Sequence, residues 1–339
     1  MRTSQRIDRF QQRHPALGFP IAVVYKFIDD QGMYLAALIT YYGFLSLFPL
    51  LLLLASVLGF VLRDNPDLRQ QILDSAISQF PVIGDQLRDP QGLQGNTTAI
   101  VIGAVTAVYG ALGVAQALQH AMNVAWAVPR HRRPNPIKAR LRSLLLLTTA
   151  GVAVLATTTL SIVAGTVGES GLVEPMAIVA TIGAIAVNTV IFGAVFRIAT
   201  ARHVRFKHNA PGAVLAALVW QAMQIFGTAY VGGVVKGAGV AYGVFALVLG
   251  LLAWTFIIAI GVVVSVEVNV VRSKHLYPRS LLTIFSDDVD LTAADQVTYR
   301  DAATAQRHKG FEEVTVSFEH DGRNHTARRE GDTEAVKSP

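Results

Sequence analysis

Residues 33–62 read MYLAALITYYGFLSLFPLLLLLASVLGFVL and contain no charged side chain. A helix needs about 20 mostly apolar residues to cross the hydrocarbon core of a membrane. The stretch therefore predicts a transmembrane helix. Pro49 stands in its middle, where the ring removes a backbone hydrogen bond and is expected to kink the helix.

Five further stretches are long and apolar enough to span, and none has a charged residue in its middle: 98–126, 144–167, 173–200, 211–235 and 242–271. Over the whole chain only 15% of residues are charged, against roughly 25% in soluble domains. The chain has no cysteine, which excludes disulfides and thiolate metal sites. We expect an all-α, polytopic membrane protein with six transmembrane helices over residues 33–271.

The segments that join these stretches are alternately rich and poor in lysine and arginine. Cytoplasmic loops carry an excess of both residues, so the alternation assigns each loop to a side of the membrane. The loop 130–142 has six basic residues and is assigned to the inside, whereas 63–95 has five Asp against three Arg and is assigned to the outside. Both termini are predicted to be cytoplasmic, together with the loop that carries Arg197, Arg202, Arg205 and Lys207.

Three segments lie outside the predicted spans. Residues 1–32 are expected to form a cytoplasmic N-terminal segment with an amphipathic helix. In the outer loop, Leu68, Ile72, Ala76 and Phe80 recur at helical spacing, which predicts an amphipathic helix on the membrane face or a lid packed on the spans. Residues 272–339 are predicted to be a cytoplasmic, mostly disordered tail, with one candidate strand at 314–318.

Several short motifs, in order along the chain, resemble the YihY/BrkB family of bacterial inner-membrane proteins. They are YYGFLSLFP at 41–49, ALQHAMNVAW at 117–126, APGA at 210–213, WQ at 220–221, YVG at 230–232, AYG at 241–243 and EVN at 267–269. The resemblance extends over about residues 20–275 and departs from the family pattern at Gly43, Phe44 and His120. It implies a multi-pass protein of the bacterial cytoplasmic (inner) membrane.

Members of this family carry an old ribonuclease label, a virulence label and a suspected role in moving lipids or amphipathic molecules. A ribonuclease needs metal ligands or an acid/base pair outside the lipid, and the nine histidines form no metal-binding motif. We therefore expect no enzyme, no cofactor, no metal and no nucleic acid. The expected partners are membrane lipids and a lipid-like substrate. The sequence is also compatible with a homo-oligomer.

Polar or kink-forming residues near the middle of the spans mark a candidate substrate pathway. Such residues serve either as interhelical hydrogen bonds or as part of a pathway. The candidates are Tyr41, Tyr42, Ser46, Pro49, Tyr109, Asn188, Trp220, Gln221 and Gln224. We hypothesise a cavity between the first, second and fifth spans, into which Pro49 frees backbone carbonyls. The alternative is a closed, dry bundle in which these groups satisfy each other.

Glu267 is an acidic residue near the cytoplasmic end of the sixth span, with Asn269 beside it. The negative end of the helix dipole makes a carboxylate unfavourable there without a partner. One interpretation is a structural ion pair with Arg142, Arg197 or Arg272. The other is proton or cation coupling, because an intramembrane carboxylate is a functional candidate by default.

These features favour a transporter or flippase of lipid-like or amphipathic molecules. The alternative from another class is a non-transporting envelope scaffold, or partner-binding membrane protein, whose tail and outer loop bind partners. Substrate-dependent flux distinguishes the two.

Overall fold

The structure is a computed structural model that describes residues 11, 14–61, 97–168, 173–202, 204–230, 240–285, 289–320 and 323–326. Its helices are α2 (Pro15–Asp29), α3 (Gly32–Val61), α6 (Thr97–Ala125), α7 (Pro136–Gly168), α8 (Val173–Ala199), α9 (Phe206–Tyr230), α10 (Val240–Lys274) and α11 (Ala293–Ala305), with a 3-10 turn at Arg130–Arg132. Strands β1 (Ser317–His320) and β2 (Arg323–Thr326) form an antiparallel hairpin that pairs Ser317 with Thr326. The chain is therefore mainly helical.

Each of the six predicted spans falls on one helix, in the order α3, α6, α7, α8, α9 and α10. Among the described residues, Thr181–Ala199, Phe206–Gly227 and Val248–Lys274 are long and apolar enough to cross a membrane. The helical fold class with candidate membrane spans is thus confirmed, and the number of spans stays a prediction. The amphipathic helix expected around Leu68 and Phe80 lies outside the described residues.

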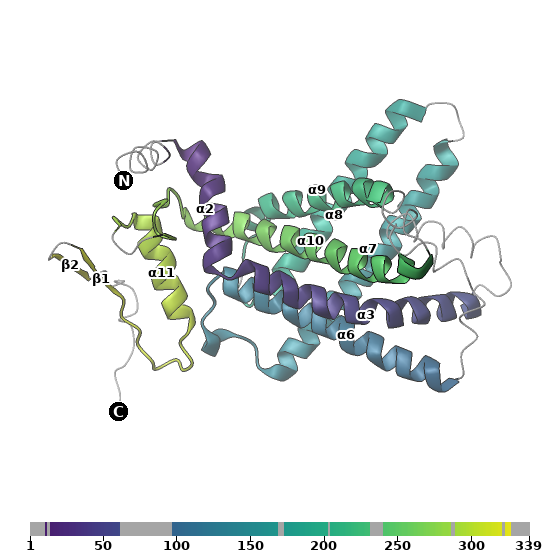
Figure 1. Ribbon diagram of the computed structural model, residues 1–339, viewed down its shortest axis with the longest axis horizontal. Helices are drawn as coiled ribbons and strands as arrows, with labels where there is room; N and C mark the ends of the chain where they lie inside the picture. Colours follow the sequence, from purple (N-terminus) through teal and green to yellow (C-terminus); the bar gives the residue numbers. More distant parts are fainter. Residues whose placement is uncertain are drawn as a thin grey trace.

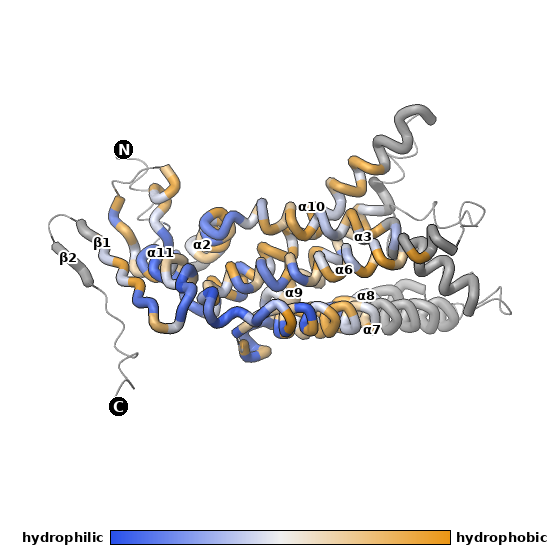
Figure 2. The backbone as a smooth tube through the Cα atoms, turned by 90° about the horizontal axis from the view of Figure 1, so that it is seen from below, coloured by the Kyte–Doolittle hydropathy of each residue, from blue (hydrophilic) through white to orange (hydrophobic). Residues whose placement is uncertain are grey.

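The six long helices form a ring in chain order. Each helix packs on the next, and α10 returns to pack on α3 and so closes the ring. Figure 1 shows α3, α6 and α10 running side by side, with α2 lying across one end of the bundle. Figure 2 shows hydrophilic residues gathered at the end that carries α2 and α11. This is the end that the charge pattern predicts to be cytoplasmic.

Small residues allow the helices of this ring to approach closely. A Cβ atom added at Gly113 of α6 would stand 2.1 Å from the Tyr42 ring of α3, and one at Gly110 would stand 2.6 Å from the Ser46 Cβ. In lipid, where no hydrophobic drive acts between helices, such close packing is a main source of helix association. The pair α3 and α6 is accordingly held by glycine facing a larger side chain.

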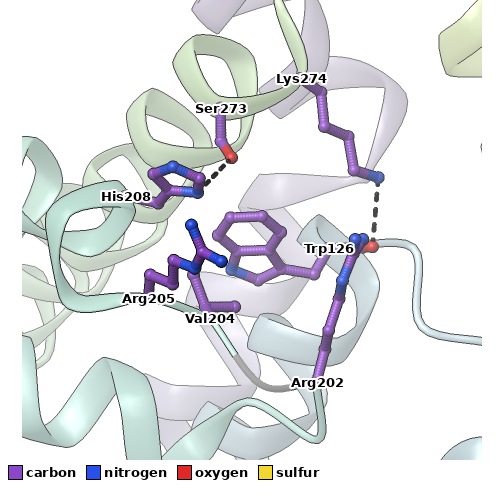
Figure 3. A pocket seen from close by; sticks show the side chains of 7 residues that line it. All are labelled: Trp126, Arg202, Val204, Arg205, His208, Ser273 and Lys274. Atoms are coloured by element: carbon purple, nitrogen blue, oxygen red, sulfur yellow. Dashed lines mark hydrogen bonds between the residues drawn. The ribbon is translucent and has the colours of Figure 1, made fainter.

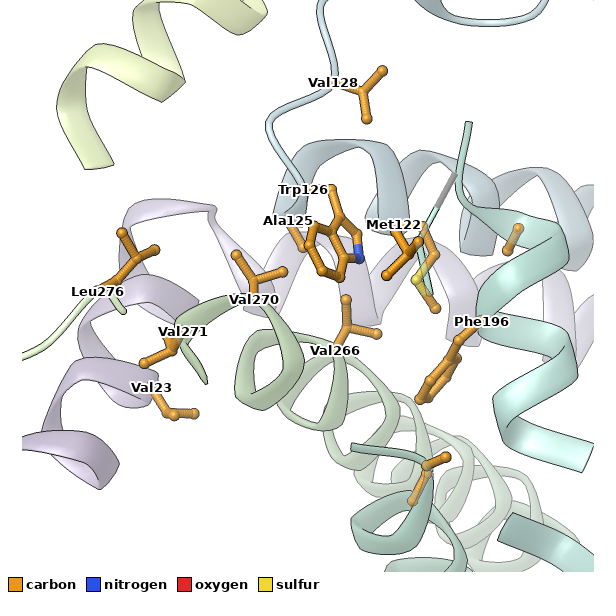
Figure 4. Close-up of a cluster of buried hydrophobic side chains, with 14 of the residues drawn as sticks. Val23, Met122, Ala125, Trp126, Val128, Phe196, Val266, Val270, Val271 and Leu276 are labelled. Carbon is orange, nitrogen blue, oxygen red and sulfur yellow. The ribbon is translucent and has the colours of Figure 1, made fainter. Parts of the chain in front are cut away.

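The end of the ring that carries α2 is filled by an apolar core. Met122 and Trp126 from α6 and its end meet Phe196 of α8 and Val266 of α10, and all are at most 4% exposed. Val23 of α2 and Leu276, which follows α10, join the same cluster (Figure 4). Protein interiors are close-packed, so the side chains that α2 shares with this core hold it in one position across the end of the ring.

Two of the ring helices end in the same way at this end of the molecule. Ala127 after α6 and His275 after α10 have positive φ of 50° and 54°. Val128 N–H then donates to Asn123 O, and Leu276 N–H donates to Val271 O, at 2.8 and 3.0 Å. These six-to-one bonds are the helix-ending pattern that follows a left-handed residue. They bring Trp126 and Lys274 to the rim of the bundle.

The expectation of a mostly disordered tail is wrong for residues 289–320. Helix α11 lies in this segment and buries Ala294, Asp295, Thr298 and Ala305. It begins with a capping box, in which the Thr292 side chain accepts from Asp295 N–H and the Asp295 carboxylate accepts from Thr292 N–H. The strand predicted at 314–318 overlaps β1 only at Ser317 and Phe318.

Candidate functional site

The candidates on α3 and α6 divide between a packed face and an exposed face. Ser46 is buried, and its hydroxyl donates to Gly43 O at 2.9 Å. Tyr42 packs on Gly113, and its ring lies edge-on to Tyr41. Tyr41 and Tyr109 are 60% and 64% exposed. The structure therefore does not bring Tyr109 inward with Ser46, and Pro49 is half-buried within α3.

The candidates on α8 and α9 lie in another part of the ring. Asn188 of α8 and Trp220, Gln221 and Gln224 of α9 are half-buried. Among the described residues α9 packs mainly on α8 and α10, and α10 stands between α9 and α3. In the described part of the chain the sixth-span helix α10 thus lies beside the first-span helix, and the hypothesised cavity between the first, second and fifth spans stays a prediction.

The two candidates on α10 are both buried but serve different interfaces. Asn269 accepts a hydrogen bond from Gly212 N–H of α9 through its Oδ1 at 2.7 Å, and a Cβ at Gly212 would lie 2.0 Å from Ser265 O. Asn269 thus joins α9 to α10. Glu267 is fully buried and faces α2 instead.

Glu267 belongs to a buried charge cluster with Lys26 and Asp30. Lys26 Nζ lies 3.8 Å from Glu267 Oε2 and also pairs with the Asp30 carboxylate. The side chains of Lys26, Asp30 and Glu267 are 4%, 9% and 0% exposed. Neither Glu267 oxygen accepts a hydrogen bond from a donor in the described part of the chain, and the Asp30 carboxyl lies beside it. A proton held between the two carboxyls would supply the missing donor.

The partner of Glu267 differs from the three arginines expected from the sequence. Arg197 and Arg272 are exposed, and Arg142 Nη1 donates to Thr200 O at 3.5 Å. The expectation was wrong because it considered basic residues next to the span ends, whereas α2 folds back across the bundle and inserts Lys26. In the sequence, Lys26 reads as one of the orientation charges before the first span.

Burial and neighbouring charge act against each other in this cluster. Burial disfavours a charged Lys26, but the carboxylates of Glu267 and Asp30 outweigh it and raise the pKa of Lys26 above its ordinary value. Burial raises the pKa of Asp30 above its ordinary value, although Lys26 opposes the shift. The cluster therefore holds one permanent cation and a carboxyl that keeps its proton to higher pH.

A second buried node fixes the helix that carries Lys26 and Asp30. Arg279 is fully buried and pairs with Asp295 of α11 and Asp29 of α2. Its guanidinium also lies 5.9 Å from the Tyr25 ring centroid and 5.6 Å from that of Tyr299. The Thr292-x-x-Asp295 pattern predicts the start of α11, but no sequence feature near Arg279 predicts that its side chain is buried.

Comparisons with known proteins identify a family and curated relatives of this chain. The family model described as virulence factor BrkB matches residues 23–282. The inner membrane protein YhjD of Escherichia coli (strain K12) is 31% identical over 105 residues, which are 30% of this chain and 31% of that protein. An uncharacterised protein of Dickeya dadantii (strain 3937) is 28% identical over 125 residues, 36% of this chain and 38% of its own.

These alignments span about a third of the length of each curated relative. No solved structure gives a significant match to this chain. The family model covers the charge cluster, Asp29 and Arg279, but ends before α11. The resemblance read from the sequence motifs is confirmed, and the chain belongs to the BrkB family of membrane proteins.

Proposed function

We propose that this protein spans the bacterial inner membrane with six helices, keeps both termini in the cytoplasm and moves lipid-like or amphipathic molecules across the bilayer. The topology is supported by the coincidence of each apolar stretch with one helix and by the alternation of basic loops. The location is supported by the relative that is named an inner membrane protein.

The observation that carries the transport proposal is the buried cluster of Lys26, Asp30 and Glu267. Ionisable residues in membrane helices are costly and tend to mark ion or substrate pathways. Replacing a buried ion pair by apolar side chains is often neutral or stabilising. A contribution to stability is therefore a weak explanation for the presence of this buried ion pair. A role in which the cluster changes its charge by one proton explains its presence better.

The place of the cluster suggests what the proton does. Lys26 and Asp30 belong to α2 and its end, and Glu267 belongs to α10, so the cluster joins the crossing helix to the ring. Loss of the shared proton leaves two carboxylates facing one ammonium, which weakens this contact through repulsion. We infer that the cluster is a proton-sensitive gate at the cytoplasmic end of the ring.

A second function, partner binding without transport, is favoured by apolar side chains in the segments that follow α10. Phe285 and Phe311 are 80% and 88% exposed there. Exposed aromatic residues on a polar surface mark contacts with proteins or with the membrane face. This alternative makes the charge cluster purely structural.

Lipid movement in reconstituted vesicles tests the proposal against the alternative. Vesicles of phosphatidylethanolamine and phosphatidylglycerol with a trace of fluorescent phosphatidylglycerol are treated with an impermeant quencher. A transporter lets the quencher reach fluorophores from both leaflets, whereas a scaffold leaves the inner half protected, as in protein-free vesicles. The Phe285→Ser/Phe311→Ser variant is the matched control: transport should persist in it, whereas partner binding should not.

A further inference from the structure

A basic pocket lies at the rim of the ring, and its Lys274 is close enough to Lys26 and Glu267 of the charge cluster for their charges to interact. Its volume is about 290 Å³, and it is lined by Trp126, Arg202, Val204, Arg205, His208, Ser273 and Lys274. In Figure 3 Arg202 and Arg205 lie on opposite sides of the Trp126 side chain. The pocket is thus built by the end of α6, the segment between α8 and α9, and the end of α10.

The positive charge of this pocket is not balanced by the described residues around it. Lys274 Nζ pairs with Asp301 at 2.8 Å and donates to Trp126 O at 3.2 Å. Arg202 and Arg205 have no ion-pair partner in the part of the chain that the structure describes, and Arg202 lies near enough to Lys274 to repel it. Cations gathered in one concave site favour an anion there.

Two further features suit an anion with oxygen acceptors. Val204, Arg205 and His208 line the pocket, so the first turn of α9 borders it, and helix N-termini favour negative charge. The Ser273 hydroxyl and His208 Nδ1 are joined at 3.2 Å and stand at the wall. Two guanidinium groups with their planar forks match phosphate oxygens in geometry as well as in charge.

We propose that this pocket binds a phosphate group, carried either by an anionic lipid headgroup at the cytoplasmic leaflet or by a soluble phosphate ester. Basic pockets between membrane helices on the cytoplasmic side are suited to anionic headgroups. The buried Trp126, whose indole is suited to the membrane interface, supplies an apolar wall beside the cations. The site does not depend on the proposed transport, because a protein that moves no lipid can still hold one.

The competing explanation is that these arginines only orient the protein in the membrane. A matched pair of variants separates the two. Arg202→Gln/Arg205→Gln removes two charges from the pocket, and Lys138→Gln/Arg140→Gln removes two exposed charges from another segment assigned to the same side of the membrane. If the arginines only orient the protein, the two double variants should bind the phosphate-bearing probe equally well. If the pocket is a binding site, only the Arg202→Gln/Arg205→Gln variant should bind it more weakly.

Native mass spectrometry of the purified protein measures bound phosphatidylglycerol, with diacylglycerol of the same chains as the phosphate-free comparison. A parallel thermal-shift titration uses inorganic phosphate against chloride at equal ionic strength. We expect the pocket variant to bind about tenfold more weakly, the size of one or two lost charged hydrogen bonds, and the control variant to match the unaltered protein. Loss in the lipid arm identifies a headgroup, and loss in the phosphate arm alone identifies a soluble ester.

Equal binding by the unaltered protein and the pocket variant in both arms would overturn the proposal. If the Arg202→Gln/Arg205→Gln variant does not yield folded protein, Arg202→Lys/Arg205→Lys is used instead. It keeps both positive charges but replaces the planar guanidinium groups by ammonium groups. Its affinity for the phosphate-bearing probe should fall severalfold, and unchanged affinity would equally overturn the site.

Discussion

Arg279 Nη2 donates to Asp29 Oδ2 at 2.8 Å and so joins two residues that are 250 positions apart in the chain. The same guanidinium pairs with Asp295, whose Oδ2 also accepts from Ser280 N–H at 3.0 Å. One buried cation therefore fastens α2, the segment after α10 and α11 to each other. Because α2 carries Lys26 and Asp30, this node also sets where the charge cluster meets Glu267.

Removing this cation should destabilise the end of the molecule that carries α2 and α11. Breaking a buried ion pair from one side costs about 3–5 kcal/mol, and here the abandoned Asp295 carboxylate stays buried, whereas Asp29 is partly exposed. We expect Arg279→Met to lower the thermal unfolding midpoint in detergent clearly, and Arg279→Lys to lower it less. Lys309→Gln, at an exposed position, is the control. A midpoint for Arg279→Met equal to that of the control would show that the node is dispensable.

The α3–α6 contact should tolerate no side chain at Gly113. A methyl group there would stand 2.1 Å from the Tyr42 ring, whereas at Gly43 nothing lies within 4 Å of the added atom. Overpacking costs about 1–3 kcal/mol. Gly113→Ala should therefore yield less folded protein than Gly43→Ala, and Tyr42→Ala should restore it, as size-exclusion profiles can measure. Equal yields of the two alanine variants would contradict the observed packing.

Stability should fall as the pH rises through the titration of Asp30. Burial raises the folded pKa of Asp30 above its ordinary 3.8, so its stabilising contribution is complete below that value and is lost as the pH passes the raised pKa. Lys26, with its own pKa raised, stays charged over this range, and Glu267 and Asp29 are the other charges that face the site.

Thermal unfolding from about pH 4 to pH 9 measures this effect. Asp30→Asn, which cannot lose a proton, should show a smaller decline than the unaltered protein. A decline of the same size in both proteins would assign the pH dependence to other groups.

The predicted orientation can be tested without background, because the chain has no native cysteine. A cysteine at Asn96 should react with an impermeant maleimide applied to intact spheroplasts, and one at Asn135, in the basic loop, should react only after lysis. The charge alternation gives the reason. Labelling of position 135 from outside would reverse the topology.

The sequence was sufficient for the long helices because length and hydropathy are local properties. Each apolar stretch meets the requirement for spanning by itself, so the bounds of α8 and α10 differ little from the predicted spans. Composition alone does not predict α11, because residues 272–339 are polar overall, although Thr292 and Asp295 form a capping box at its start. That motif is the local signal for a helix in a segment whose composition predicts disorder.

The charge cluster could not be predicted in the same way. The sequence marks Glu267 as a candidate because it is an acid within an apolar helix, but its partner lies on a helix that folds back from the other end of the chain. Only tertiary placement tells an orientation charge from a buried ion-pair partner, and Lys26 is such a case. The same limit applies to Tyr109 and Gln224, whose depth along a helix does not say which neighbour they face.

The most direct test of the central claim is the rate of fluorescent phosphatidylglycerol movement in vesicles that contain the unaltered protein, Glu267→Gln or Arg272→Gln. Arg272→Gln removes an exposed charge from the same helix and should leave the rate unchanged. If the buried cluster gates transport, the unaltered protein moves lipid, and Glu267→Gln moves it about tenfold more slowly at equal amounts of folded protein, which corresponds to a barrier change of about 1.4 kcal/mol. Equal rates for Glu267→Gln and the unaltered protein, or no movement above protein-free vesicles, would contradict it.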